Sequence, residues 1–253
     1  MKEFSVEKFF DPIKRPNIGG DLNEKMKNSM DIVSRMACTL NHSLYVIDYL
    51  KRSFVYVSPN MLFLCGYSME QVIEWGYSFY TKVIPEKDLK RLLEINKAGF
   101  DFYYKLPIEK RYMYSIEYDF DLVHISKKVT RVNQRLIPLI INEDGDLWLA
   151  VCIVTPIYSK ARDKTIIKNF NTGEQFIYQE KEKSWYKNTL PLLSAKETLI
   201  LQLSSQGYTN TDIAKELLLN VNTIKFHKRN IFQKLDVKNC IEAITVASHW
   251  GLI

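Results

Sequence analysis

The sequence predicts an α+β domain with a five-stranded antiparallel sheet and short helices, followed by an all-α domain of four short helices. Three observations lead to this expectation. The chain has 253 residues, more than the roughly 100 to 200 residues of a usual single domain. Strand-like runs rich in Tyr, Ile and Val continue to about residue 160. Beyond about residue 189 the strand signal stops and helix-start signals recur.

The pattern divides the chain into four regions. Residues 1–28 mix charges with prolines and a Gly19-Gly20 pair, which is typical of an N-terminal arm rather than a core. Residues 29–160 form the predicted α+β domain. Residues 161–188 form a charged linker with a hairpin expected around 171–174, and residues 189–253 form the all-α domain.

The α+β domain is expected to begin with an amphipathic helix over 30–40 and two short strands over 44–48 and 54–57. Helices over 69–75 and 86–97 follow. Three longer strands then cover 112–125, 130–141 and 147–158, and the last two join across Asp144-Gly145, a pair that favours a hairpin turn. This element order predicts an antiparallel sheet.

Helix starts in the all-α domain are marked by residues whose side chains satisfy the free N–H groups of a first turn. Ser194 to Glu197 matches a capping box, and Gly207 supplies a left-handed stop. Further starts are expected at 209–212, at Asn220 and at 239–242. The second and third helices are separated by a tight turn at 219–220, which is the helix-turn-helix arrangement.

The third of these helices, over 221–235, has two distinct faces. Ile224, Ile231 and Leu235 share one apolar stripe that should face the core. The opposite face is polar and basic, and no acidic residue occurs from 222 to 234. On charge alone, a solvated basic helix face is the preferred interpretation. Together with the tight turn and the caps, the acid-free face favours a surface that a phosphate backbone attracts.

Segments of the all-α domain carry a family resemblance. LSAKE at 193–197, GYTN at 207–210, DIAKEL at 212–217, NTIKFH at 222–227 and IFQKL at 231–235 are spaced as in helix-turn-helix domains of the LuxR/NarL type. Residues 189–253 thus resemble that family. Two departures are Asn220, which replaces the usual Ser or Thr and caps as well, and Cys240, which replaces a common Arg.

The resemblance implies that the third helix lies in the major groove of double-stranded DNA. It implies base contacts from Lys225, Phe226 and Arg229. It also implies phosphate contacts from five further side chains: Thr209, Asn210, Thr223, His227 and Lys234. It is equally expected that His227 is a packed, hydrogen-bonded side chain at the edge of the helix. Family members often dimerise through the fourth helix, here about 239–249.

Residues 29–160 resemble a PAS domain. The segments that carry this resemblance are VID at 46–48, FVYVSPN at 54–60, LCGYS at 64–68 and IPEKDL at 84–89. The resemblance implies a half-open sheet closed by short helices, with a pocket that either holds an unknown small molecule or is filled by side chains. Most of the tyrosines are expected to pack rather than to line a cavity.

No cofactor or metal is predicted. The helix over 86–97 lacks the histidine of haem-binding PAS domains, and no Asn-Cys-Arg segment of the flavin photosensors occurs. The four cysteines do not have the spacing of metal ligands, so we expect them to be reduced structural thiols; they are Cys38, Cys65, Cys152 and Cys240. The chain also lacks a Gly-rich phosphate loop, a G-x-S-x-G elbow and an H-E-x-x-H motif, so we expect no enzyme and no catalytic residues.

Composition sets the remaining expectations. Hydrophobic residues at 46% and charged residues at 25% exclude disordered and collagen-like classes. The longest strongly apolar stretch, 147–158, is too short to cross a bilayer, and residues 1–10 lack the apolar core of a signal peptide, so we expect a cytoplasmic protein without membrane contact. The net charge of +6 permits an anionic partner.

These observations favour a dimeric, DNA-binding transcriptional regulator controlled by a PAS-like sensor and dimerisation domain, with RNA polymerase as a further candidate partner. Two alternatives remain open at this point. In one, the chain is a small-molecule or protein-interaction receptor in which DNA binding is secondary. In the other, it is a haem or flavin redox sensor, an alternative that the absorbance spectrum of the pure protein would test.

Overall fold

The computed structural model describes residues 5–17, 22–40, 42–157, 165–188, 193–250 and 252–253. The chain divides into two compact units, Met1–Asn188 and Thr189–Ile253, which are described separately. The expected Gly19-Gly20 arm segment, the end of the strand at Tyr158 and the boundary at 189 lie outside the described residues.

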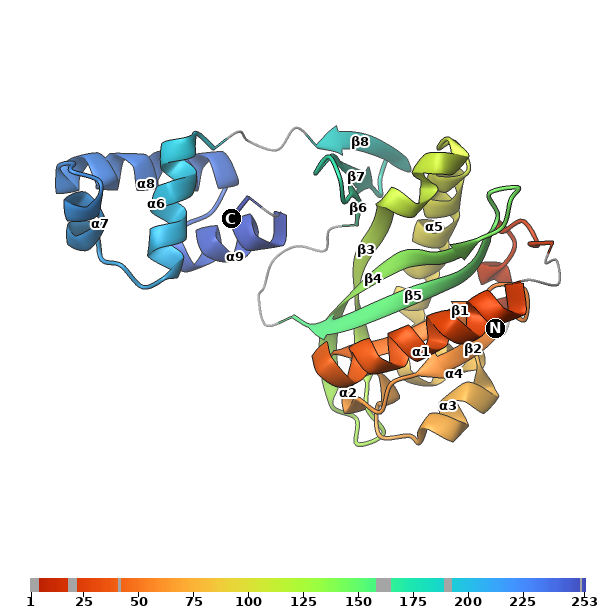
Figure 1. The fold of residues 1–253 in the computed structure, drawn as a ribbon. Coiled ribbons are helices and arrows are strands. Elements are labelled where there is room, and N and C mark those ends of the chain that lie inside the picture. The colour runs from red at the N-terminus through yellow and green to blue at the C-terminus, as the bar shows by residue number, and fades with distance from the viewer. Residues whose placement is uncertain (1–4, 18–21, 41, 158–164, 189–192, 251) are drawn as a thin grey trace. The chain divides into compact units, whose positions relative to one another are not determined.

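A single antiparallel sheet forms the centre of the N-terminal unit (Figure 1). Its strand order is β2-β1-β5-β4-β3-β6-β7-β8. The bounds are Ser43–Asp48 (β1), Ser53–Val57 (β2), Tyr114–Val123 (β3), Val129–Ile141 (β4), Leu147–Pro156 (β5), Ile166–Asn169 (β6), Gln175–Gln179 (β7) and Ser184–Asn188 (β8). The hairpin turn between β4 and β5 places Gly145 at φ 81°, a left-handed conformation that suits glycine.

The sheet has eight strands, so the predicted five-stranded sheet is wrong in its extent. The expected linker hairpin at 161–188 supplies β6 and β7, and a further strand, β8, comes after them. Ile166–Asn169 pairs with Tyr114–Glu117 along the open edge of β3. A lone two-stranded hairpin is marginally stable in water, and pairing with an open sheet edge supplies the missing backbone partners.

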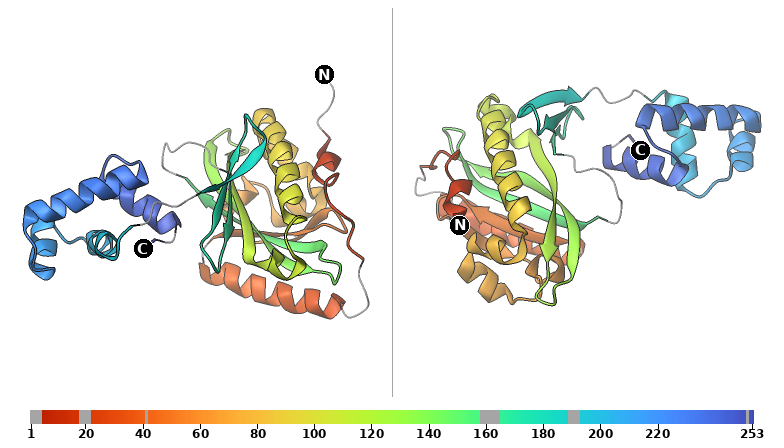
Figure 2. Two further views of the ribbon diagram at one scale, coloured as in Figure 1. Left: turned by 90° about the horizontal axis from the view of Figure 1, so that it is seen from above. Right: turned by 180° about the vertical axis from the view of Figure 1, so that it is seen from behind.

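Helices cover both faces of this sheet. On one face, α2 (Met61–Leu64), α3 (Met69–Trp75), α4 (Ser78–Val83) and α5 (Glu86–Tyr103) enclose the main core, and η2 (Ile108–Met113) comes after them. On the other face, α1 (Leu22–Leu40) packs through Val33 against Val46 and Trp148 (Figure 1). Figure 2 shows α5 beside the β6–β8 strands, where the Trp185 indole N–H donates to the Ala98 carbonyl at 3.0 Å.

The N-terminal segment contributes to the main core, although residues 1–28 are expected to form an arm outside it. A single turn of 3₁₀ helix, η1 (Val6–Phe9), places the rings of Phe9 and Phe10 among buried residues. The pattern is misleading here because two phenylalanines stand among charged neighbours and prolines. Their burial against Tyr77 and Tyr80 shows that this segment completes the core.

The C-terminal unit contains the four predicted helices, α6 (Ala195–Ser205), α7 (Asn210–Glu216), α8 (Val221–Leu235) and α9 (Cys240–Trp250). Ser194 and Glu197 form the predicted capping box at α6. At α9, the Asn239 carboxamide oxygen accepts from the Glu242 N–H at 2.9 Å. The unit has its own hydrophobic core, centred on Ile200, Leu201 and Ile213 and separate from that of the sheet.

Candidate nucleic-acid interface

The turn between α7 and α8 fixes the orientation of α8. Thr209 and Asp212 form the capping box that starts α7, and the Asn220 side chain accepts from the Asn222 N–H at 2.8 Å to start α8. Between them, the Leu219 N–H donates to the Ala214 carbonyl at 2.8 Å. Leu218 takes a left-handed conformation at φ 52° and is 92% exposed. The predicted helix-turn-helix is therefore present.

The inner face of α8 is apolar, as predicted. Ile224 and Ile231 are fully buried, and Leu235 is 3% exposed. They pack against residues of α6, α7 and α9 in one cluster. This packing leaves one side of the 15-residue helix to solvent.

The three residues predicted to contact bases all lie on the exposed side of α8. Lys225 and Arg229 are exposed, and Phe226 is 50% exposed. The Arg229 guanidinium lies over the Phe226 ring, with its carbon 5.8 Å from the ring centroid. A cation over an aromatic face is attracted to it, so the ring restricts where the guanidinium sits before any ligand arrives.

The five residues predicted to contact phosphates divide into three groups. Asn210, Thr223 and His227 are half-buried, and the His227 ring lies 5.9 Å from that of Phe226. Thr209 is exposed, but its hydroxyl already donates to the Asp212 carboxylate at 2.5 Å. Lys234 differs from the other four, because its ammonium reaches inward.

Lys234 forms an ion pair with Glu197 of α6. The Nζ–Oε2 distance is 2.7 Å, and Glu197 is 4% exposed. Burial alone would raise the pKa of Glu197, but hydrogen bonds from Lys234 and Ser194 outweigh it and hold that pKa below its usual value. The same carboxylate accepts from the Ser194 N–H at 2.7 Å, so this pair ties α8 to the start of α6.

Sequence reasoning identifies Glu197 only as a capping residue and Lys234 only as a phosphate contact. The two stand 37 positions apart, and their pairing depends on how α6 packs against α8. The one signal in the sequence is a lysine at the end of a helix whose other face is apolar. Lys228, on the same helix, is half-buried.

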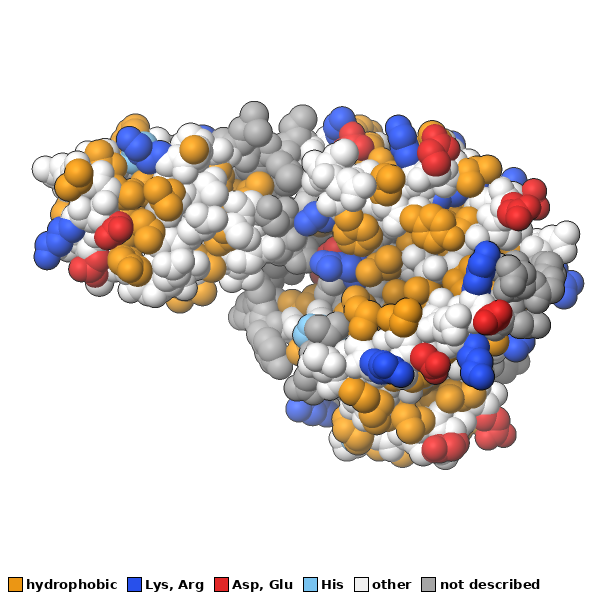
Figure 3. Space-filling view, viewed as in Figure 1, with side chains coloured by type: hydrophobic (Ala, Val, Ile, Leu, Met, Phe, Trp, Pro, Cys, Tyr) orange, Lys and Arg blue, Asp and Glu red, His pale blue; other side chains and the backbone are white. Residues whose placement is uncertain are grey.

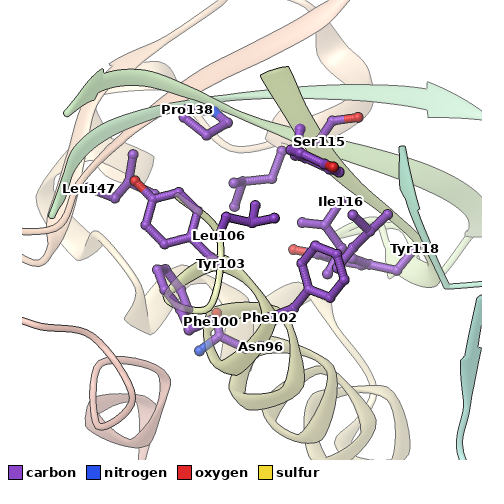
Figure 4. Close-up of a pocket in the computed structure, with 14 residues that line it drawn as sticks. Asn96, Phe100, Phe102, Tyr103, Leu106, Ser115, Ile116, Tyr118, Pro138 and Leu147 are labelled. Carbon is purple, nitrogen blue, oxygen red and sulfur yellow. The ribbon is translucent and has the colours of Figure 1, made fainter. Parts of the chain in front are cut away.

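A pocket in the N-terminal unit is the second place where a ligand would fit. It offers about 60 Å³ between α5 and strands β3 and β4. Figure 4 shows side chains of α5, among them Phe100 and Tyr103, pointing toward Ile116 and Leu147 across this space. Its walls are mostly apolar, and the Tyr103 hydroxyl donates to the Gly145 carbonyl at 3.1 Å.

The described residues give little support for metal binding or for a reactive thiol. They contain no group of three or more His, Cys, Asp or Glu side chains that could hold a metal ion. Burial raises the pKa of the Cys65 thiol to about 12, and it raises that of Cys152 to about 12 as well. Both thiols are therefore neutral and unreactive near pH 7.

The comparisons with known proteins concern mainly the C-terminal unit. Residues 191–247 match the family of bacterial regulatory proteins described as the luxR family, so this segment is a luxR-family helix-turn-helix domain. Fimbriae Z protein of Escherichia coli K12 is 31% identical over 113 residues, which cover 44% of this chain and 49% of that protein. Oxygen regulatory protein NreC of Staphylococcus haemolyticus is 43% identical over 56 residues, 22% of this chain and 26% of that protein.

Among solved structures, the Vibrio cholerae VqmA dimer is 13% identical over 88% of both chains, with a TM-score of 0.31. The chain spans about half the length of Fimbriae Z protein and less of NreC. Among the described residues, no helix combines the length and the apolar character needed to cross a membrane.

Proposed function

We propose that this chain is a sequence-specific, DNA-binding transcriptional regulator. The observation that carries the proposal is the exposed, acid-free face of α8 in a domain that matches the luxR family. The width of a helix suits the major groove of B-DNA, where each base pair presents a distinct pattern of donors and acceptors. Transcriptional control follows from the family to which this domain belongs.

In this proposal, Lys225, Phe226 and Arg229 contact bases. Arg and Lys donate to guanine O6 and N7, and an aromatic side chain contacts the thymine methyl group. Asn210, Thr223 and His227 border this face and contact phosphates, as does Thr209 through its end of α7. Lys234 is not among the proposed phosphate contacts, because Glu197 holds its ammonium.

The N-terminal unit serves as a PAS-like sensor in this proposal. Strands β2-β1-β5-β4-β3 lie side by side, and α2 to α5 come between β2 and β3 in the chain and pack on one face of the sheet. The pocket against α5 supports a sensing role. We place the protein in the cytoplasm, where regulators of transcription meet DNA in bacteria, and expect no enzymatic activity.

We further propose that the regulator acts as a homodimer. On the outer side of α1, Ile32 is 60% exposed and Met36 is 50% exposed. Figure 3 shows hydrophobic side chains gathered on the face of the N-terminal unit where α1 lies. A single helix-turn-helix contacts only a few base pairs, so two copies on adjacent half-sites give useful affinity.

Selection from a random double-stranded DNA library tests the proposal. The full chain should enrich one sequence motif, and the Lys225→Ala/Arg229→Ala double variant should enrich none. Lys215→Ala, which removes an exposed lysine of α7 rather than of α8, is the matched control and should enrich the wild-type motif. Enrichment of the same motif by the double variant would place the contact surface elsewhere.

A further inference from the structure

The N-terminal segment closes a second, smaller cavity inside the main core. This cavity offers about 20 Å³, which is room for about one water molecule. Phe9 of the segment lines one side of it. The other walls come from α4, α5 and the inner face of the sheet, and they include Tyr49, Tyr77, Tyr80, Tyr118, Asn96 and Gln134.

Tyr80, Gln134 and Tyr118 of the cavity wall form a hydrogen-bond network with Tyr45, which lies behind the wall. The Tyr45 hydroxyl donates to Gln134 Oε1 at 2.5 Å, so in its 2.5 Å contact with Tyr80 the Tyr80 hydroxyl is the donor. Gln134 Nε2 donates to the Tyr118 hydroxyl at 2.6 Å. Tyr118 keeps its own hydrogen, and among the described residues no acceptor takes it.

The walls of the cavity carry no charge near pH 7. Burial raises the pKa of Tyr49, Tyr77, Tyr80 and Tyr118 above that of an exposed tyrosine. The remaining lining residues are two amides and apolar side chains. A charged group moved into this space would lose its hydration without meeting an opposite charge, so the site selects for neutral molecules.

The segment is held mainly by the packing of its side chains against the main core. Phe9 and Phe10 supply the buried surface, and the Asn96 carboxamide donates to the Phe9 carbonyl at 2.7 Å. The Lys14 N–H donates to the Tyr104 hydroxyl at 2.9 Å, and the Glu7–Arg52 ion pair is exposed. One uncapped turn of 3₁₀ helix has no independent stability, so the position of the segment depends on its packing. Phe9 and Phe10 are the buried part of that packing, Val6 and Ile13 pack beside them, and the Arg52 guanidinium lies 5.3 Å from the centroid of the Phe10 ring.

We propose that residues 5–13 form a displaceable plug, and that the space filled by the Phe9 ring is a binding site for a small, uncharged, flat molecule with a hydrogen-bonding group. Such a molecule replaces the ring in the aromatic wall and accepts the free hydrogen of Tyr118. Asn96 exchanges the Phe9 carbonyl for the ligand or for solvent. This inference rests on the proposed sensor role of the N-terminal unit.

Phenol is a suitable probe, because it combines a ring of the size of Phe9 with one hydroxyl. Calorimetric titration of the full chain should show that Phe9→Ala binds phenol about tenfold more tightly than the wild type, since no plug has to leave. Phe10→Ala is the matched control, because Phe10 is equally buried and anchors the segment but does not line the cavity. It should also bind phenol more tightly than the wild type, because it loosens the segment while the Phe9 ring stays in the chain.

Hydrogen exchange of the wild-type chain tests displacement directly. Saturating phenol should speed exchange of the amides in residues 5–13 and slow exchange around Tyr77 and Tyr80. Tyr118→Phe in the Phe9→Ala chain should weaken phenol binding, and benzoate should bind neither variant. A cooperative thermal melt confirms that each variant is folded.

Three results would contradict the proposal that residues 5–13 form a displaceable plug. They are slower exchange of residues 5–13 with phenol bound, unchanged phenol affinity in Phe10→Ala, and failure of Phe9→Ala to bind phenol at millimolar concentration. All of these measurements are made without DNA. A negative result in the phenol experiments therefore does not bear on the DNA-binding proposal. Likewise, failure to select a DNA motif does not bear on the proposal that residues 5–13 form a plug.

Discussion

Cationic residues on α8 have two different surroundings. Lys225 and Arg229 are exposed, and Arg229 is held over the Phe226 ring. Lys234 lies against the buried Glu197 carboxylate. Substitutions should therefore separate the two groups, with the first affecting DNA binding and the second affecting the stability of the domain.

Replacing Arg229 with Ala should weaken binding to the selected site by about 1–3 kcal/mol and relax base preference at one position. Phe226→Ala should have a smaller effect of the same kind, because it frees the guanidinium. Fluorescence anisotropy with single-base variants of the site, at one fixed salt concentration, measures both effects. A uniform loss across all site variants would instead identify Arg229 as a phosphate contact.

Glu197→Gln should lower the free energy of unfolding of the C-terminal unit by about 1–3 kcal/mol at pH 7, because Lys234 loses its charged partner. Gln still fits a capping box, so the loss reports the charge. The folded-state pKa of Glu197 is lowered, so its contribution is complete above the unfolded pKa of about 4.3 and disappears as pH falls through the folded value. Denaturant melts from pH 7 to pH 3 should show the difference shrinking below about pH 4, and a constant difference would contradict the pairing.

Contacts between residues that are close in the sequence can be predicted from it, whereas contacts that depend on how helices pack cannot. Ser194, Thr209 and Asn220 cap the expected helices because a capping bond spans only two or three residues. The Lys234–Glu197 pair depends on the packing of α8 against α6, which no local pattern encodes.

At the scale of elements, β8 is held to α5 by one aromatic side chain. Trp185 donates to the Ala98 carbonyl and contacts the Tyr178 and Phe102 rings, with centroids 5.0 and 5.8 Å away. Its neighbour Tyr186 is 48% exposed. Substitutions at Trp185 and Tyr186 therefore compare a packed and an exposed aromatic side chain of the same strand.

Trp185→Ala should destabilise the N-terminal unit by about 2–4 kcal/mol, somewhat less than the loss at a fully buried aromatic. Tyr186→Ala should change it by less than about 0.5 kcal/mol, as is usual for exposed sites. Chemical denaturation followed by circular dichroism measures both. Equal effects of the two substitutions would mean that β8 is not anchored by the indole.

The first five strands are predictable because long runs of Tyr, Ile and Val mark β3, β4 and β5. The strand β8 is missed by sequence pattern, since SWYKN alternates weakly and lies among lysines and glutamates. Its place in the sheet comes from pairing with β7 and from the contact of Trp185 with α5. Both are properties of the assembled unit.

At the scale of the whole molecule, each unit has its own core. We expect the isolated segment 189–253 to be a monomer and to bind palindromic DNA much more weakly than the full chain. The reason is that α9 is short and exposes one large apolar side chain among its described residues, Ile241, whereas α1 exposes two, Ile32 and Met36, on a longer helix.

Light scattering gives the size of both proteins, and a DNA titration at one fixed salt concentration gives their affinities. Ile32→Glu in the full chain should reproduce the weak binding of the segment if α1 forms the dimer contact. If the segment dimerises and binds as tightly as the full chain, the N-terminal unit has no role in dimerisation.

The pairing of β6 with β3 also determines where the two units can be separated in an engineered chimera. A cut near residue 160, where the strand-rich region ends by sequence pattern, would remove β6, β7 and β8 and leave the Tyr114–Glu117 edge without backbone partners. Exposed sheet edges recruit strands from other chains, so a fragment cut there should aggregate. A fusion that joins this sensor to a different DNA-binding domain should keep every residue through Asn188 and replace residues 189–253.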